Sequence, residues 1–122
     1  MKPLNDGQLT INCDDPAPGV IRLDWRGRSD ARFPGEMLNP YLSQVLAQAH
    51  SSAAAVEMHF EALEFLNSST ISVVMHFLNS AREAHVPLSF TYQPKVHWQK
   101  LSFEALRVFE VLDKQVRVVA LQ

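Results

Sequence analysis

The middle of the chain places one segment of helical periodicity between two segments of strand periodicity, and this order constrains the fold most. Apolar residues alternate in AAAVEMHF, residues 53–60, and in PLSFTY, residues 87–92, as in strands with one buried face. In segment 69–84 they recur at helical spacing. We expect this helix to end before Val86-Pro87, because proline disfavours helix in the residue ahead of it. The order strand, helix, strand predicts parallel strands joined by a right-handed crossover.

The rest of the chain extends this pattern in both directions. Residues 8–12 and 20–27 are expected to form a hairpin around the turn DDPAPG. Asn39-Pro40 is typical of a helix start, with asparagine as the N-cap and proline at the first helical position. The main predicted strands are 20–26, 53–60, 87–92 and 116–121, and the predicted helices lie near 40–50, 69–84 and 95–112. The expected fold is a single α/β domain over residues 1–122, with a mostly parallel sheet, an antiparallel N-terminal hairpin and helices packed on it.

The same periodicities assign the buried side chains. In the strand from residue 20, the inward side comprises Ile21, Leu23 and Trp25. In the long helix, the predicted buried stripe comprises Ile71, Val74, Met75 and Leu78. Val73 and Phe77 lie beside this stripe, either at the core edge or in an apolar contact patch.

Composition and charge narrow the class of protein. Hydrophobic residues make up 47% and charged residues 20% of the 122 residues, as in one globular domain. The formal net charge of -2 gives no basic field for nucleic acid, and the single Cys13 can form neither an internal disulfide nor a cysteine metal cluster. No signal peptide is visible, and polar residues interrupt the uncharged stretch 65–81, so no membrane span is expected. These features favour a cytoplasmic, bacterial protein.

Three hydroxyl residues follow an asparagine at the start of the long helix, in FLNSSTISVV. The segment VEMHFEALEFLNSSTISVVMHFLNSAREAHVPL resembles the centre of a STAS domain, the family of anti-sigma factor antagonists and of cytoplasmic domains of sulphate transporters. In that family, D-S-S-G opens a helix, and a small-residue stretch precedes a G-V-P-L strand start. The resemblance extends from about Trp25 to the C-terminus, with Asn67 in place of the aspartate and Thr70 in place of the glycine.

The resemblance implies a binding module and not an enzyme. It makes Ser68 the phosphoacceptor of a serine kinase, with a phosphatase that restores the hydroxyl. The unmodified form would bind an anti-sigma factor or the kinase, and the modified form would not. The expected contact surface comprises Asn67, Ser68, Ser69, Thr70, Val73 and Phe77. The alternative is a STAS-like accessory subunit, for example of a lipid-transport ATPase, that packs permanently on its partner and is never phosphorylated.

Physical chemistry offers two interpretations of Ser68. A helix N-terminus presents unpaired N–H groups and partial positive charge, so it would stabilise a phosphate that adds a charge of about -1.5 to -2. However, Asn67 or Ser68 could serve only as the helix cap, since both residue types are common caps. Ser69 and Thr70 are the fallback phosphoacceptors, because they lie further into the helix.

Other chemistries have weaker support. No pair with the i, i+4 spacing of a helical zinc site occurs among His59, His76, His85 and His97. We therefore expect no metal, and we assign His76 to the surface. The chain lacks a G-x-S-x-G elbow, so neither catalysis nor a cofactor is expected. One loop that could meet an acidic partner is predicted to contain Arg26, Arg28 and Arg32.

Overall fold

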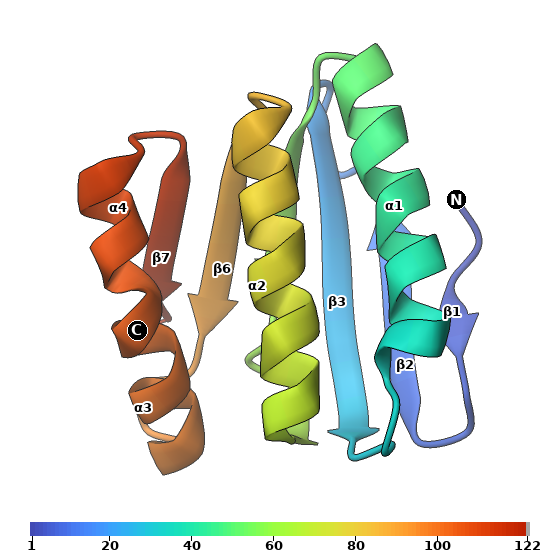
Figure 1. Ribbon diagram of the computed structural model, residues 1–122, viewed down its shortest axis with the longest axis vertical. Coiled ribbons are helices and arrows are strands. Elements are labelled where there is room, and N and C mark those ends of the chain that lie inside the picture. The colour runs from blue at the N-terminus through green and yellow to red at the C-terminus, as the bar shows by residue number, and fades with distance from the viewer. Residues whose placement is uncertain (122) are drawn as a thin grey trace.

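The computed structural model describes residues 1–121 as a sheet with helices packed on it (Figure 1). The strands are β1 (Leu4–Asn5), β2 (Leu9–Asp14), β3 (Val20–Ser29), β4 (Ala55–His59), β5 (Leu63–Leu66), β6 (Leu88–Tyr92) and β7 (Val116–Ala120). The helices are α1 (Gly35–Ser51), α2 (Ser68–Glu83), α3 (His97–Glu104), a 3-10 turn at Ala105–Arg107 and α4 (Val108–Leu112). The predicted α/β class is confirmed.

The seven-stranded sheet is antiparallel at its N-terminal edge and parallel elsewhere. Its strand order is β1-β2-β3-β4-β6-β7. Strands β1 to β3 pair antiparallel, and β3, β4, β6 and β7 pair parallel, which confirms the predicted hairpin and parallel strands. β5 continues beside β3 where β4 ends, with Leu63 opposite Gly27. The sequence does not predict β5, because its four residues show no alternation.

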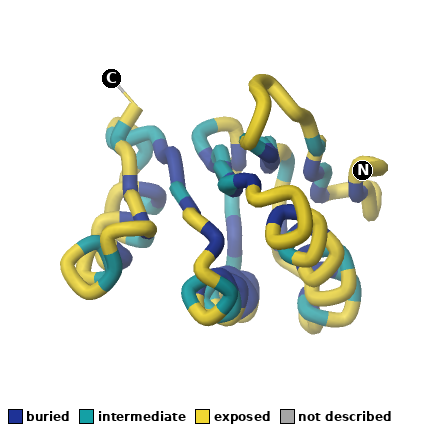
Figure 2. Tube along the Cα trace, turned by 90° about the horizontal axis from the view of Figure 1, so that it is seen from above, coloured by how far each residue is buried: buried dark blue, intermediate teal, exposed yellow. Residues whose placement is uncertain are grey.

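All the helices lie on one face of the sheet, as the view from above shows (Figure 2). Ile21, Leu23 and Trp25 point to that face and are buried, as predicted. The residues between them on β3 point to the opposite face, which no helix covers within residues 1–121. The molecule therefore has a packed core on one side of the sheet and a polar, uncovered face on the other.

The first helix begins earlier than predicted. α1 starts at Gly35, so Pro40 lies inside the helix and Asn39 is not the N-cap. Proline lacks the N–H that would bond to the carbonyl of Glu36, but Glu36 and Pro40 are exposed. Leu38, in contrast, is fully buried in the core. We infer that burial of Leu38 favours a helix that starts before the local start signal at Asn39-Pro40.

The buried face of α2 is rotated relative to the prediction. Val74 and Leu78 are buried as expected, but Ile71 and Met75 are only half-buried. The side chains buried in addition are Thr70, Val73, Phe77 and Ala81. α1 packs beside α2, as Figure 1 also shows, and so α2 is covered by a helix as well as by the sheet. Periodicity within one helix does not indicate on which side its neighbour lies.

A buried glutamine links α3 to the turn between β4 and β5 through hydrogen bonds. The amide Nε2 of Gln99 donates to the backbone carbonyls of Phe60 at 2.9 Å and Leu63 at 3.0 Å. Its Oε1 accepts from the N–H of Gln93 at 2.7 Å. Gln99 is fully buried, so these three bonds replace bonds to water, two of them at the turn and one at Gln93, after β6.

Gln99→Leu should therefore lower the free energy of unfolding by about 1–3 kcal/mol, because buried backbone groups would lose their partners. Urea denaturation measures the loss. Lys100→Leu, at the exposed neighbouring position, should change stability by no more than about 0.5 kcal/mol. Equal stability of the two variants would contradict the role assigned to Gln99.

Candidate functional site

Asn67 organises the start of α2. Its backbone is extended (φ -87°, ψ 173°) and its Oδ1 accepts from the N–H of Thr70 at 2.9 Å, which makes Asn67 the N-cap. The same oxygen accepts from the Thr70 hydroxyl at 2.7 Å, and Nδ2 donates to the carbonyl of Ala31 at 2.9 Å. An aspartate could keep the cap but could not donate to Ala31. The amide therefore ties the loop before α1 to the start of α2.

Ser68 and Ser69 are the first two residues after the cap, and both are exposed. Because Asn67 accepts the Thr70 N–H, the Ser68 hydroxyl is not needed as a cap. The first turn of α2 contains no acidic residue. A phosphate on Ser68 would therefore lie near the backbone N–H groups of the helix start without a carboxylate in the same turn to repel it.

Three residues of the predicted contact surface are buried, which corrects their assignment. Thr70 is fully buried, and its hydroxyl lies 2.7 Å from that of Ser29 at the end of β3. A phosphate on Thr70 would have to displace α2 from β3, so Thr70 is not an accessible fallback acceptor. Val73 and Phe77 are 7% and 3% exposed, since α1 packs beside α2, and they belong to the core. The accessible hydroxyl pair is Ser68 and Ser69.

A surface hollow of about 460 Å³ opens between the N-terminal ends of α1 and α2. It is lined by Arg32, Phe33, Pro34, Gly35, Glu36, Asn39, Ser69 and Ser72. The Phe33 side chain is 65% exposed, and the Arg32 guanidinium lies 5.5 Å from its ring centroid. An exposed aromatic ring beside an arginine is typical of the anchors of protein interfaces. The sequence predicts a loop here, and no local pattern in it distinguishes Phe33.

The three arginines do not share a loop, contrary to the prediction. Arg26 and Arg28 lie in β3, which continues to Ser29 because β5 pairs with its last residues. Arg28 forms an ion pair with Asp30 at 3.6 Å and lies over the ring of Phe65 at 4.8 Å. Of the three, only Arg32 borders the hollow beside Ser69.

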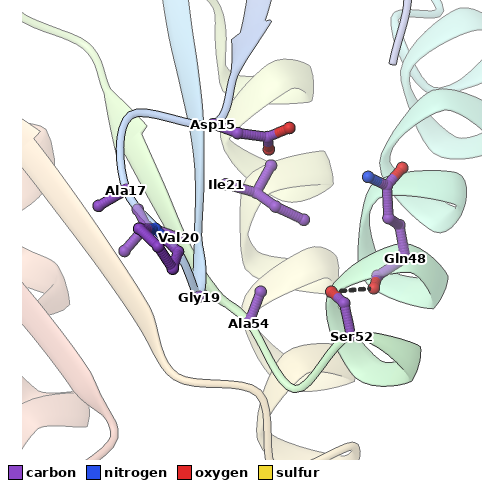
Figure 3. A pocket seen from close by; sticks show the side chains of 9 residues that line it. Asp15, Ala17, Gly19, Val20, Ile21, Gln48, Ser52 and Ala54 are labelled. Atoms are coloured by element: carbon purple, nitrogen blue, oxygen red, sulfur yellow. Dashed lines mark hydrogen bonds between the residues drawn. The ribbon is translucent and has the colours of Figure 1, made fainter.

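A second hollow, of about 290 Å³, lies where α1 ends and β3 and β4 begin (Figure 3). Small and apolar residues such as Gly19, Ile21 and Ala54 form much of its wall. The Ser52 hydroxyl is already used, since it donates to the carbonyl of Gln48 at 2.7 Å. Asp15 is the one charged residue among those that line it. This hollow therefore lacks the converging polar groups of a specific ligand site.

The cap assignment makes a testable distinction between two neighbouring residues. Asn67→Ala should cost about 0.5–2 kcal/mol of stability, because it removes the N-cap. Ser68→Ala should cost no more than about 0.5 kcal/mol, because the Ser68 side chain is exposed and does not cap the helix. Thermal and urea denaturation of both variants measure the difference. A larger loss for Ser68→Ala than for Asn67→Ala would contradict the assignment.

Comparison with models of known protein families and with curated protein sequences finds no match to this chain. Within residues 1–121, no helix combines the length and the apolar character needed to cross a membrane.

Proposed function

We propose that this chain is a STAS-like binding module of the cytoplasm, similar to an anti-sigma factor antagonist, and that phosphorylation of Ser68 switches its binding off. The observation that carries the proposal is that only one of two adjacent polar residues caps the helix. Asn67 caps α2, whereas the exposed Ser68 has no part in the cap. Ser68 can therefore be modified without loss of the interactions that hold the helix start.

The contact surface of this proposal differs from the one expected from sequence. It contains Ser68 and Ser69 together with Arg32 and Phe33 across the adjoining hollow. It excludes the buried Thr70, Val73 and Phe77. Asn67 stabilises the surface through its hydrogen bond to the carbonyl of Ala31. An anti-sigma factor or a serine kinase would dock here when Ser68 is unmodified, and a phosphatase would restore that state.

The switch would act through electrostatics and not through unfolding. A phosphate on Ser68 gains from the partial positive charge of the helix start, so the free domain keeps its fold. Docking would bury the same phosphate, and a partner surface matched to a neutral hydroxyl offers it no counter-charge. Burial of an unpaired charge is costly, and the phosphorylated form therefore binds more weakly.

A second candidate, the permanently bound accessory subunit, is favoured by a different surface. Four apolar side chains on α3 and α4 are more than half exposed: Leu101, Val108, Val111 and Leu112. Exposed apolar side chains of this kind suit an interface that remains covered. In this case partner binding would not depend on the charge of Ser68.

Ser68→Asp and Ser68→Glu should stay folded and bind the partner about 10–100-fold more weakly, a loss of about 1.4–2.8 kcal/mol. Ser68→Ala should bind like the native chain and accept no phosphate, because it adds no charge. The partner is first captured from cell extract on the native chain, and the affinities of the variants for that partner are then measured. Phosphosite mapping after incubation with a candidate serine kinase tests the acceptor itself.

Ser43→Asp is the matched control, since Ser43 is an exposed serine within α1 and outside the hollow beside Ser69. It should leave the affinity unchanged. Equal affinities for all the Ser68 variants, with no phosphate on Ser68 or Ser69, would leave Ser68 as an ordinary surface residue. A partner that stays bound to every variant would support the accessory-subunit role.

A further inference from the structure

On its uncovered face, the sheet carries a compact group of charged side chains from β3, β4 and the turn after β4. Glu57, His59 and Glu61 alternate with the buried residues of β4 and of the turn that follows it. The parallel register places Asp24 of β3 opposite His59, and Arg22 opposite Glu57. Strand alternation and register together thus bring these five side chains to one place.

Three of these residues form a cluster of metal-ligand types. One donor atom from each of Asp24, His59 and Glu61 lies within 4.8 Å of the others, and all three residues are half-buried. In a tetrahedral site with bonds of about 2.0–2.1 Å, donors lie about 3.3 Å apart, so modest side-chain adjustment would bring them around one ion. The donors come from two adjacent strands and the tight turn that Gln99 holds.

A neutral His59 imidazole cannot donate a hydrogen bond to both of the carboxylates that it contacts. Its Nε2 lies 3.2 Å from Glu57 Oε1, and its Nδ1 lies 2.8 Å from Glu61 Oε1. A neutral ring has a single N–H and can donate to only one of these carboxylates. If Nε2 donates to Glu57, the lone pair of Nδ1 faces Glu61. A cation bound to Nδ1 and to the carboxylate would turn this repulsive contact into a favourable one.

The second carboxylate oxygen of Glu61 is free to contact an ion. Its Oε2 is shielded from solvent and has no hydrogen-bond partner among residues 1–121. Buried carboxylate oxygens are costly unless a donor or a cation satisfies them.

We propose that Asp24, His59 and Glu61 bind a divalent transition-metal ion such as Zn²⁺ on the uncovered face of the sheet. Imidazole together with carboxylates suits zinc and its neighbours in the first row, whereas Mg²⁺ and Ca²⁺ prefer oxygen ligands alone. The two ligand carboxylates balance the charge of a divalent ion. The site adds a function to this chain that is separate from Ser68.

Two further charged residues contact the proposed ligands and can orient them. Glu57 Oε1 lies 3.2 Å from Nε2 of His59, so it can accept a hydrogen bond from Nε2–H when Nδ1 binds the ion. Arg22 donates to both oxygens of Asp24, at 3.1–3.2 Å, and so orients that carboxylate. Arg22 and Glu57 are thus positioning residues, and their opposite charges leave the loaded site neutral.

The i, i+4 spacing of a helical zinc site does not describe this group. That criterion requires ligands four residues apart on one helix, whereas these ligands lie on two strands and in the turn after β4. The pattern E-x-H-x-E at Glu57, His59 and Glu61 has the strand period of two and is the local signal. Only the register adds Asp24.

The test is calorimetric titration of the metal-free full chain with Zn²⁺, with Mg²⁺ as a second probe. We expect one Zn²⁺ per chain and no comparable binding of Mg²⁺. Glu61→Gln and His59→Ala should each abolish stoichiometric binding. Glu57→Gln should weaken it about 10–100-fold, as for other residues that position a ligand histidine. His76→Ala, at an exposed histidine of α2, is the matched control and should bind like the native chain.

A spectroscopic readout assigns the ligand atom. Zinc should shift the Nδ1 resonance of His59 in nitrogen NMR and leave that of His76 in place. Absence of zinc binding by the native chain would overturn the proposal. Unchanged affinity in Glu61→Gln, which preserves the size of the side chain, would also overturn it, even if His59→Ala failed to fold.

Discussion

Phe60→Ala should lower the free energy of unfolding by about 3–5 kcal/mol, the range expected when a fully buried aromatic side chain is removed. Phe60 is fully buried where β4 ends. Its ring centroid lies 4.9 Å from that of Trp25, 4.7 Å from that of Phe103 and 6.0 Å from that of Phe90. The ring thereby joins strands β3 and β6 to helix α3. Alanine would leave a cavity that rings on three separate elements cannot easily fill.

Urea denaturation with a two-state fit measures this loss. Phe33→Ala is the matched control, because the same ring is removed from a side chain that is 65% exposed. It should change stability by no more than about 0.5 kcal/mol. Similar losses of unfolding free energy in both variants would contradict the stabilising role assigned to the buried aromatic cluster around Phe60.

Leu78→Ala should cost about 2–5 kcal/mol for a related reason. Leu78 is fully buried in the middle of α2 and belongs to the main core cluster. Alanine favours a helix at least as well as leucine does, so the loss would report packing and not helix propensity. Because α2 carries Ser68 at its start, the same variant shows how far the proposed binding surface depends on the anchoring of this helix.

Asn79→Ala, one residue further along α2, is the exposed counterpart and should stay within about 0.5 kcal/mol of the native chain. A loss well under 1 kcal/mol for Leu78→Ala would mean that α2 does not pack through this face. Comparison of the losses in Leu78→Ala and Phe60→Ala also tests whether the α2 side and the α3 side of the core contribute comparably to stability.

The start of α2 was only partly predictable from sequence. The asparagine and the three hydroxyl residues identified a helix start, and its position is correct to one residue. Whether Asn67 or Ser68 caps the helix depends on backbone geometry and side-chain direction, which residue types alone leave open. The role of Thr70 depends on Ser29, which is 41 positions away. The exposed Ser68 and the buried Thr70 are therefore distinguished by tertiary contacts.

The sequence alone determined the order of the main strands and helices, without β1, β5 or the division of the last helical region, the parallel character of most of the sheet and the inward faces of β3 and β4. These properties follow from periodicity within short segments, because a strand or helix with one apolar face must bury it. Tertiary structure alone decided where α1 begins, which side of α2 is covered and that Asp24 meets His59 and Glu61. Each of these depends on a neighbouring element from elsewhere in the chain, and no local pattern records the position of that neighbour.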